Sequence, residues 1–329
     1  MVLRHTANHT LDKQIATTLF TTEHPFCDTV PCSYIGSTLV TQPTSSLLVV
    51  VLALQYLLAG AVVLYNAVKD GGWADKNCYR GCLPAPSDAP DGKARVWWAY
   101  AFLVWGVSVV FAGVSFQAFT FQLRCTGDPH GDAVCLHEKY DWVAQTYYIL
   151  QSIGIDLFVV ARSYRAMRKH TEMAKRYVIL HSGLYVLCVC VAPPLRGYIV
   201  SMVFITPSFV VLRMINFVCL GDKILHAAWT IMSCSFLWYL AWIAFAPYGR
   251  WWEETGWWFS ENDALHLPLV LFVPLAYVSV RKVKDKPAGD GVTLAETGKR
   301  LAAPEWSPLH FLIAATEETE EGALLTSKV

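Results

Sequence analysis

Apolar residues in this chain gather into long runs that polar connections separate. A helix that crosses a bilayer needs about 20 predominantly apolar residues. Seven runs reach or approach that length: Leu47–Val68, Val96–Phe121, Trp142–Ala161, Tyr177–Val191, Tyr198–Leu220, Ile224–Ala246 and Ala264–Val280. The fourth is short, and the turn that follows it, Pro193–Gly197, is tight enough to predict an antiparallel hairpin with the fifth. The pattern predicts an all-α, polytopic membrane protein with seven transmembrane helices.

Composition supports a membrane protein. Of 329 residues, 54% are hydrophobic and 16% are charged, and the mean hydropathy is +0.36, above the range of ordinary soluble domains. We expect three parts: residues 1–45 as a short extracytosolic segment, residues 46–282 as the seven-helix domain, and residues 283–329 as a largely disordered cytosolic tail.

Positive charge is distributed by side, which predicts the orientation in the membrane. Alternate connections and the segment after the last span are basic, with Lys69, Lys76, Arg80, Lys93 and Arg95, then Arg162, Arg165, Arg168, Lys169, Lys175 and Arg176, then Arg281, Lys282, Lys284 and Lys286. The other connections hold few: Arg124, Lys139, Arg196 and Arg250. We therefore expect the N-terminus outside or in a lumen and the C-terminus in the cytosol. The net charge is zero, which does not favour nucleic acid as a partner.

Cysteines and a glycosylation sequon fit this orientation. Cys27, Cys32, Cys125 and Cys135 all fall on the expected oxidising side, where disulfides form. Cys125–Cys135 is a candidate disulfide; a cross-pair to the N-terminal cysteines and four free thiols are the alternatives. Asn8 begins an Asn-His-Thr sequon and is a candidate glycosylation site.

The third span carries one continuous polar stripe. Asp141, Gln145, Tyr148, Ser152 and Asp156 follow at steps of four, three, four and four residues, so they share one face of the helix. Lipid does not tolerate such a face, and we expect it to line a polar cavity inside the bundle. Asp156 lies deep enough to suggest a functional site. The structural alternative is a protonated or arginine-paired aspartate that locks helices together.

A second candidate site lies at the outer ends of the second, third and seventh spans. Ser115, Asp141 and Gln145 share that depth with Asp263 and His266, which neighbour each other on one helix face. A carboxylate beside an imidazole can orient it as a base or metal ligand. A helix cap with an interfacial histidine explains the same residues.

Two further observations belong to these spans. Gln117, also a candidate lining residue, is about 200° around the helix axis from Ser115 and cannot share its face. The two remaining intramembrane histidines, His181 and His226, fall near the inner ends of their predicted spans. We expect both to be structurally satisfied and not to act as ligands.

These residues resemble a known superfamily. Gly113–Phe119 reads Gly-x-x-x-Gln-Ala-Phe, an aspartate follows in the third span, and Asn262, Asp263 and His266 form Asn-Asp-x-x-His. The pattern resembles the seven-helix hydrolases that include alkaline ceramidases and the progestin and adiponectin receptors. The resemblance implies a serine, an aspartate and zinc-binding histidines, which carry over to Ser115, to Asp156 or Asp141, and to His266.

The carried-over zinc site is incomplete. The histidine of the second span is absent, with Gln117 or Phe119 near its place, and no second histidine follows His266 in the seventh span. Because a catalytic zinc needs three good protein ligands, we predict no cofactor, and zinc stays open only as an alternative with an incomplete ligand set. Retinal is excluded, because no lysine lies between Trp257 and Val280.

Three functions remain open from the sequence. The first is a degenerate or metal-independent hydrolase-like protein, in which Ser115, Asp156 and His266 are the candidate catalytic residues. The second is a receptor-like protein that senses a lipid or small-molecule ligand, and the third is a small-solute transporter. The resemblance favours the first function, and the buried polar stripe is compatible with all three.

Overall fold

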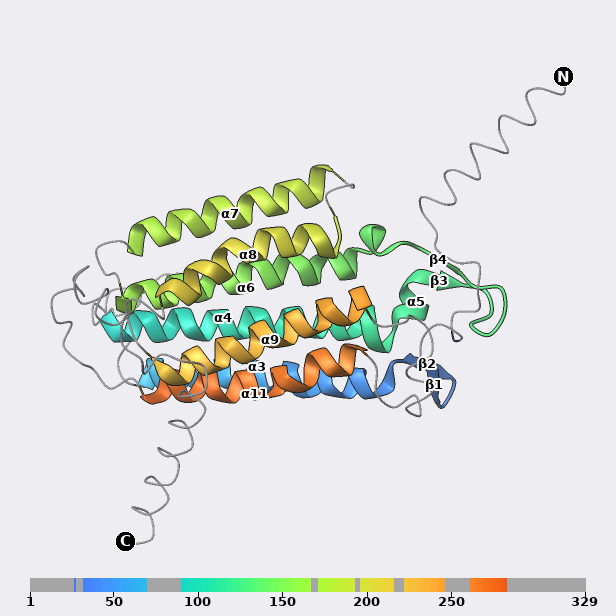
Figure 1. Cartoon of the computed structure of the whole chain (residues 1–329), viewed down its shortest axis with the longest axis horizontal. Helices are drawn as coiled ribbons and strands as arrows, with labels where there is room; N and C mark the ends of the chain where they lie inside the picture. The colour runs from blue at the N-terminus through green and yellow to red at the C-terminus, as the bar shows by residue number, and fades with distance from the viewer. Residues whose placement is uncertain are drawn as a thin grey trace, which may run out of the picture.

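The chain folds into a bundle of long helices. The computed structural model describes residue 27 and residues 32–69, 90–166, 171–192, 196–215, 222–245 and 261–282. Its long helices are α3 (Pro43–Lys69), α4 (Pro90–Ala112), α6 (Trp142–Ala166), α7 (Thr171–Val191), α8 (Tyr198–Met214), α9 (Lys223–Phe245) and α11 (Glu261–Lys282). They lie side by side and alternate in direction along the chain (Figure 1).

Within the described residues, each predicted apolar run coincides largely with one of these helices, and Val96–Phe121 continues past α4 into the segments that follow it. Five helical segments are long and apolar enough to cross a membrane, namely Pro43–Lys69, Ala94–Ala118, Trp142–Tyr164, Thr171–Val191 and Asn262–Val280. Tyr198–Met214 is apolar but shorter. The protein is thus mostly helical and has the apolar helices of a multi-pass membrane protein.

The fourth run was predicted too short. Helix α7 begins at Thr171 and has 21 residues, six residues earlier than the apolar run. Its first turn is charged, but Glu172 accepts a 2.5 Å salt bridge from Lys175 at the i, i+3 spacing. An acidic residue near a helix N-terminus and such a pair both stabilise helix. His181 is therefore the eleventh of the 21 residues of α7 and lies further from the start of its helix than the apolar run predicted.

The centre of the bundle is aromatic and closely packed. Helix α4 lies between α3 and α6, and Trp98, Phe102 and Phe158 form ring contacts across α4 and α6 with centroids 5.1 to 5.7 Å apart. A Cβ on Gly60 would meet Leu103 at 2.7 Å, so α3 and α4 approach closely because a glycine stands there. This half of the bundle is dense.

Helix α7 lies at the edge of the bundle, against α6 and α8 (Figure 1). Much of its surface is apolar and exposed: Ile179 is 70% exposed and Leu180 is 73% exposed. Its buried positions are Thr171, Ala174, Val178, Tyr185 and Val189. These recur at steps of three, four and seven residues and form one narrow face. The exposed apolar face is suited to lipid.

At one end of the bundle, the end of α4 and the start of α6 meet small strands. The all-helical prediction did not include these strands. Strands β1 (Cys32–Ile35) and β2 (Thr38–Thr41) form one antiparallel ribbon, and β3 (Cys125–Thr126) and β4 (Val134–Cys135) form another. Both ribbons lie at the same end of the bundle (Figure 1). Cys27 bonds Cys32 and Cys125 bonds Cys135, so the predicted Cys125–Cys135 pair is confirmed. We call this end the disulfide end.

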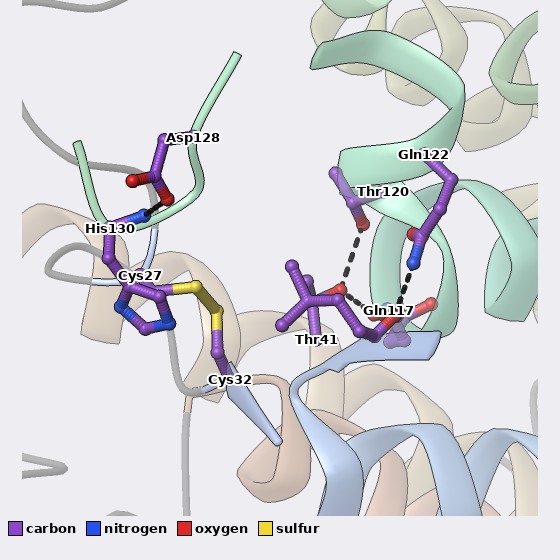
Figure 2. Close-up of a disulfide and its surroundings, with 9 residues drawn as sticks. Cys27, Cys32, Thr41, Gln117, Thr120, Gln122, Asp128 and His130 are labelled. Atoms are coloured by element: carbon purple, nitrogen blue, oxygen red, sulfur yellow. Dashed lines mark hydrogen bonds between the residues drawn. A yellow bond between two sulfur atoms is a disulfide. The ribbon is translucent and has the colours of Figure 1, made fainter. Parts of the chain in front are cut away.

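The N-terminal ribbon is anchored to the end of the second span. The Thr41 hydroxyl donates to the Gln117 carbonyl oxygen and lies 3.3 Å from the Thr120 hydroxyl, and the Gln122 amide donates to the Leu39 carbonyl (Figure 2). The Cys27 amide donates to the Pro129 carbonyl at 2.9 Å. The segment before the first span and the segment after the second span therefore pack together and form one cap over the helices.

Several predicted features lie outside the described residues. These are the sequon at Asn8 and the tail after residue 282. The division at residues 45 and 46 falls inside α3, which begins at Pro43.

We expect Cys125→Ser to lower the free energy of unfolding by about 2 to 3 kcal/mol, because the bond closes a loop of roughly ten residues in the unfolded chain. The measurement is thermal unfolding of the purified protein in detergent. Cys234→Ser is the matched control, since Cys234 is a free, exposed cysteine on α9, and it should leave the midpoint unchanged. Equal midpoints for both variants would contradict a structural role of the disulfide.

Candidate functional site

Asp156 is the centre of a buried polar network. Its side chain is completely buried. The His181 Nδ1 atom lies 2.9 Å from its Oδ2 atom, the Ser182 hydroxyl donates to the same oxygen at 2.5 Å, and the Ser208 hydroxyl donates to Oδ1. The Tyr177 hydroxyl lies 2.8 Å from the Ser208 hydroxyl. We call these five residues the Asp156 network.

The network joins three helices near their midpoints. Asp156 is the fifteenth of the 25 residues of α6, His181 the eleventh of the 21 residues of α7, and Ser208 the eleventh of the 17 residues of α8. A carboxylate at such depth is expensive unless it is hydrogen-bonded. Hydroxyl and imidazole groups on α7 and α8 supply those bonds, so Asp156 holds both helices against α6.

Aromatic rings enclose His181. The Tyr177 ring stacks on the imidazole with centroids 5.2 Å apart, and the Phe204 ring contacts it at 5.7 Å. Phe204 also contacts Tyr185 at 4.7 Å. The imidazole is thereby held in one orientation with Nδ1 toward the carboxylate. His181 was expected to be a satisfied histidine, and its contacts agree, but its partner was not anticipated.

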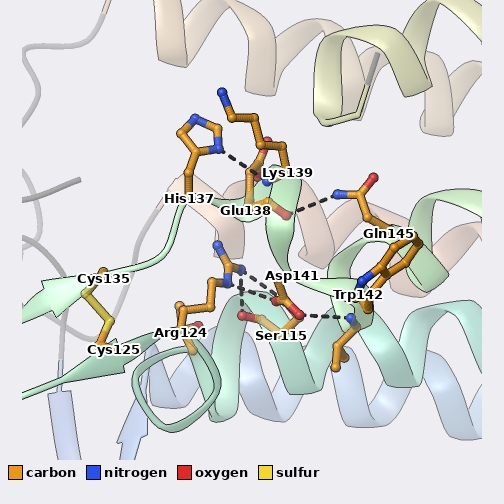
Figure 3. Close-up of polar contacts among 12 residues, drawn as sticks. Ser115, Arg124, Cys125, Cys135, His137, Glu138, Lys139, Asp141, Trp142 and Gln145 are labelled. Atoms are coloured by element: carbon orange, nitrogen blue, oxygen red, sulfur yellow. Dashed lines mark hydrogen bonds and ion pairs between the residues drawn. A yellow bond between two sulfur atoms is a disulfide. The ribbon is translucent and has the colours of Figure 1, made fainter. Parts of the chain in front are cut away.

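A second polar cluster lies at the disulfide end. The Ser115 hydroxyl donates to Asp141, the Arg124 Nε atom lies 3.0 Å from Asp141 Oδ2, and Arg124 Nη2 donates to the Ser115 carbonyl at 2.7 Å. Asp141 also accepts from the Val143 amide at 2.8 Å, the geometry of an N-cap for α6. Figure 3 shows these groups beside the Cys125–Cys135 bond. This cluster fixes the start of α6.

A π-helical segment, Gly113–Ala118, places Ser115 in that cluster. The Phe119 amide donates to the Val114 carbonyl at 3.1 Å, an i to i−5 bond that widens the turn. Ser115 and Gln117 are both buried. They meet different partners, α6 on one side and the N-terminal ribbon on the other, as their angular separation requires.

His266 belongs to a third set of contacts. Its Nδ1 atom lies 3.0 Å from the Ser45 hydroxyl on α3, and the neighbouring Asn262 amide donates to Gln42 at 2.7 Å. Asp263 is buried beside them. The three candidate catalytic residues Ser115, Asp156 and His266 thus have separate partners, and the structure does not bring them together.

The remaining lining candidates follow the α6 stripe. The Gln145 amide donates to the Glu138 carbonyl at 3.1 Å, the Tyr148 hydroxyl donates to the Glu138 carboxylate at 3.3 Å, and Ser152 is fully buried. All five stripe residues, Asp141, Gln145, Tyr148, Ser152 and Asp156, are buried. The stripe therefore faces the protein interior, as predicted.

An ion pair at the opposite end was not anticipated. Arg162 is almost completely buried at the end of α6, with Nη1 3.9 Å from Asp222 Oδ2. Asp222 also accepts from the Ser279 hydroxyl at 2.5 Å and from the Leu225 amide at 3.0 Å. This group connects α6, α9 and α11. The sequence places Arg162 in a basic connection, but its contact with Asp222 spans 60 positions and no local pattern indicates it.

Among the described residues, no group of three or more histidine, cysteine, aspartate or glutamate side chains is arranged to hold a metal ion. The zinc ligand set implied by the resemblance is therefore not assembled in the part of the chain that the structure covers. Comparisons of the chain with models of protein families, with curated proteins and with solved structures find no match.

We expect Ser208→Ala to destabilise the protein by about 1 to 2 kcal/mol, because the buried Asp156 carboxylate loses one of its three hydrogen-bond donors. The matched control is Ser235→Ala. Ser235 is also buried, but its hydroxyl donates to the Ile231 carbonyl of its own helix. Thermal unfolding of both variants in one detergent tests this; equal losses would show that Ser208 does not support Asp156.

Proposed function

We propose that this chain is a seven-helix membrane protein that senses a lipid or small molecule, and that the Asp156 network is the element through which it changes state. The observation that carries the proposal is the burial of an ionisable carboxylate whose three hydrogen bonds all come from the two neighbouring helices. Ionisable residues inside a membrane protein mark functional sites by default.

The position of α7 supports a switching role. The buried face of α7 is narrow, and a large part of its surface is exposed and apolar. Apolar packing therefore contributes little to holding α7 against the bundle. His181 and Ser182 supply a polar attachment to Asp156. A ligand that competes for the carboxylate or separates these helices would shift α7 relative to α6. Helix shifts of this kind are a recurrent form of switching.

The proposed orientation places the disulfide end outside the cytosol. Two disulfides at one end of the bundle support it, because such bonds persist in oxidising compartments. The basic connections and the segment after α11 then face the cytosol, in agreement with the positive-inside rule. The same orientation puts the N-terminal ribbon at the surface that an external ligand meets first.

The hydrolase alternative has less support. A hydrolase on the resembling plan needs its serine, aspartate and histidine around one reacting atom. Here the Ser115 hydroxyl donates to Asp141, His266 contacts Ser45, and Asp156 contacts His181. Each candidate has a local partner that accounts for its burial. The resemblance alone, without this convergence, does not support hydrolysis.

Ligand-dependent thermal stabilisation tests the sensing proposal. Purified protein is heated in the presence of sphingoid bases, fatty acids, sterols and small amines. A true ligand at a hundredfold excess over its Kd adds about 2.7 kcal/mol of stability. We expect at least one class to raise the midpoint of the wild type, and Asp156→Asn to abolish the rise while the protein remains folded.

Asp128→Asn is the control for the loss of one carboxylate, because Asp128 lies exposed in the loop between β3 and β4, and it should keep the full response. No stabilisation by any class would count against sensing. Stoichiometric zinc that disappears in His266→Ala would overturn it in favour of the hydrolase.

A further inference from the structure

Three buried hydroxyl groups lie next to the Asp156 network and make no hydrogen bond to it. They are the hydroxyls of Ser152 on α6, Tyr185 on α7 and Ser201 on α8, and all three residues have no exposed surface. The Tyr185 and Ser201 hydroxyls interact with each other, whereas the Ser152 hydroxyl has no hydrogen-bond partner. We call these three groups the hydroxyl layer. A buried hydroxyl that makes no hydrogen bond is costly, and such groups commonly bind water.

All three hydroxyls lie on the same side of Asp156. Ser152 precedes Asp156 by four residues on α6, which runs away from the disulfide end; Tyr185 follows His181 by four residues on α7, which runs toward it (Figure 1). Four residues of helix rise about 6 Å. Ser201 precedes Ser208 by seven residues on α8, a rise of about 10 Å. The hydroxyl layer is therefore displaced toward the disulfide end.

Beyond this layer the polar groups continue to the end of the bundle. Tyr148, one turn before Ser152 on α6, packs in one cluster with Tyr185. Its hydroxyl donates to the Glu138 carboxylate at 3.3 Å, and Glu138 also accepts from the Tyr198 amide at 3.4 Å. Glu138 lies in the connection before α6. Polar groups thus line one seam from mid-bundle to the disulfide end.

The opposite direction is different. On that side of Ser208, α8 continues with four apolar residues before its one charged residue, Arg213; they are Phe209, Val210, Val211 and Leu212. The Arg213 guanidinium contacts the His226 carbonyl at 3.3 Å and the Thr230 hydroxyl at 2.9 Å. On α7, Tyr177 is followed toward that end by Arg176, Lys175 and Glu172. On the far face of α6, α4 presents Trp105 to Gly154. Tyr177 and His181 are the titratable side chains of α7 in the network.

We propose that Asp156 and His181 form a proton-binding site that exchanges protons with the disulfide end through the hydroxyl layer and waters bound to it. Chains of aspartate, glutamate, histidine and hydroxyl groups are the usual proton relays of membrane proteins. Tyr185 and Ser201 interact directly, and bridging waters complete the other steps of the path. Glu138 is the group at its outer end.

The proton balance is simple. With Asp156 ionised and His181 neutral, the pair carries one buried negative charge. A hydronium ion at the disulfide end gives up one O–H bond and becomes water, and its proton forms one N–H or O–H bond on the pair, which is then neutral overall. Release reverses the step along the same path. No other bond changes, and no further reactant is needed.

The proposal deepens the sensing function, since both rest on Asp156 as the responsive group. It adds that the external pH sets the charge of that group. The two remain separable by experiment, because proton uptake is observed without any ligand, whereas sensing is scored by ligand-dependent stabilisation. Proton exchange without a ligand response would sink the sensing proposal and leave the proton site standing.

Time-resolved infrared spectroscopy after a pH jump tests the path on the full-length protein in lipid nanodiscs. The Asp156 signal is defined as the carboxyl and imidazole difference bands that Asp156→Asn removes. We expect Tyr185→Phe and Ser152→Ala to slow this signal by about tenfold or more, the effect of losing one group from a proton relay. The end point of the signal should change little.

Tyr164→Phe is the matched control. Tyr164 follows Asp156 by eight residues on α6, so it lies on the side away from the disulfide end, and it stacks on Trp97 outside the Asp156 network. The path predicts that Tyr164→Phe leaves the rate within about twofold. Equal slowing in Tyr185→Phe and Tyr164→Phe, or slowing in Tyr164→Phe alone, would overturn the proposed direction. The absence of any pH-dependent band that Asp156→Asn removes would overturn the proton site itself.

Discussion

Asp156 has to be hydrogen-bonded by protein, because neither lipid nor an apolar core solvates a carboxylate. Three donors meet this requirement, and they come from the middle of α7 and α8. The position of α7 depends on that requirement more than on apolar packing, since α7 exposes most of its large aliphatic side chains. One buried charge thus organises the half of the bundle that apolar contacts hold least firmly.

At the disulfide end, the buried Asp141 carboxylate is stabilised in another way. Asp141 is paired with Arg124, caps α6 and accepts from Ser115, and the Cys125–Cys135 bond follows Arg124 directly in the chain. A carboxylate that is paired with a cation and a helix N-terminus is strongly held in one state. The Asp156 network has only hydroxyl groups and one imidazole. It is therefore the carboxylate site that a change of protonation or a ligand can alter.

The sequence predicted the helices and the stripe, because hydrophobic runs and the 3.6-residue period are local properties. It missed the start of α7, where paired charges interrupt the apolar run, and the short ribbons, which two disulfides stabilise. It also missed the partners of Asp156 and of Arg162. His181 is 25 residues and Asp222 is 60 residues from these groups along the chain, so which helices become neighbours decides the contact. The sequence places Ser152 on the interior face of α6. Whether its hydroxyl finds a hydrogen-bond partner depends on which groups of α7 and α8 lie opposite it.

The two faces of α6 differ in a way that determines where movement can occur. Toward α4, Gly154 lies against Trp105, and a Cβ at Gly154 would lie 3.3 Å from the Trp105 ring. Phe158 is enclosed by the rings of Trp98, Phe102 and Trp229. Such packing resists sliding, because any displacement opens a cavity or forces a clash. Toward α7 and α8 the contacts are the hydrogen bonds to Asp156, the hydroxyl layer and a small cluster around Tyr148 and Tyr185. A change of charge at Asp156 therefore acts on α7 and α8, while α3, α4 and α6 stay together as the fixed part of the bundle.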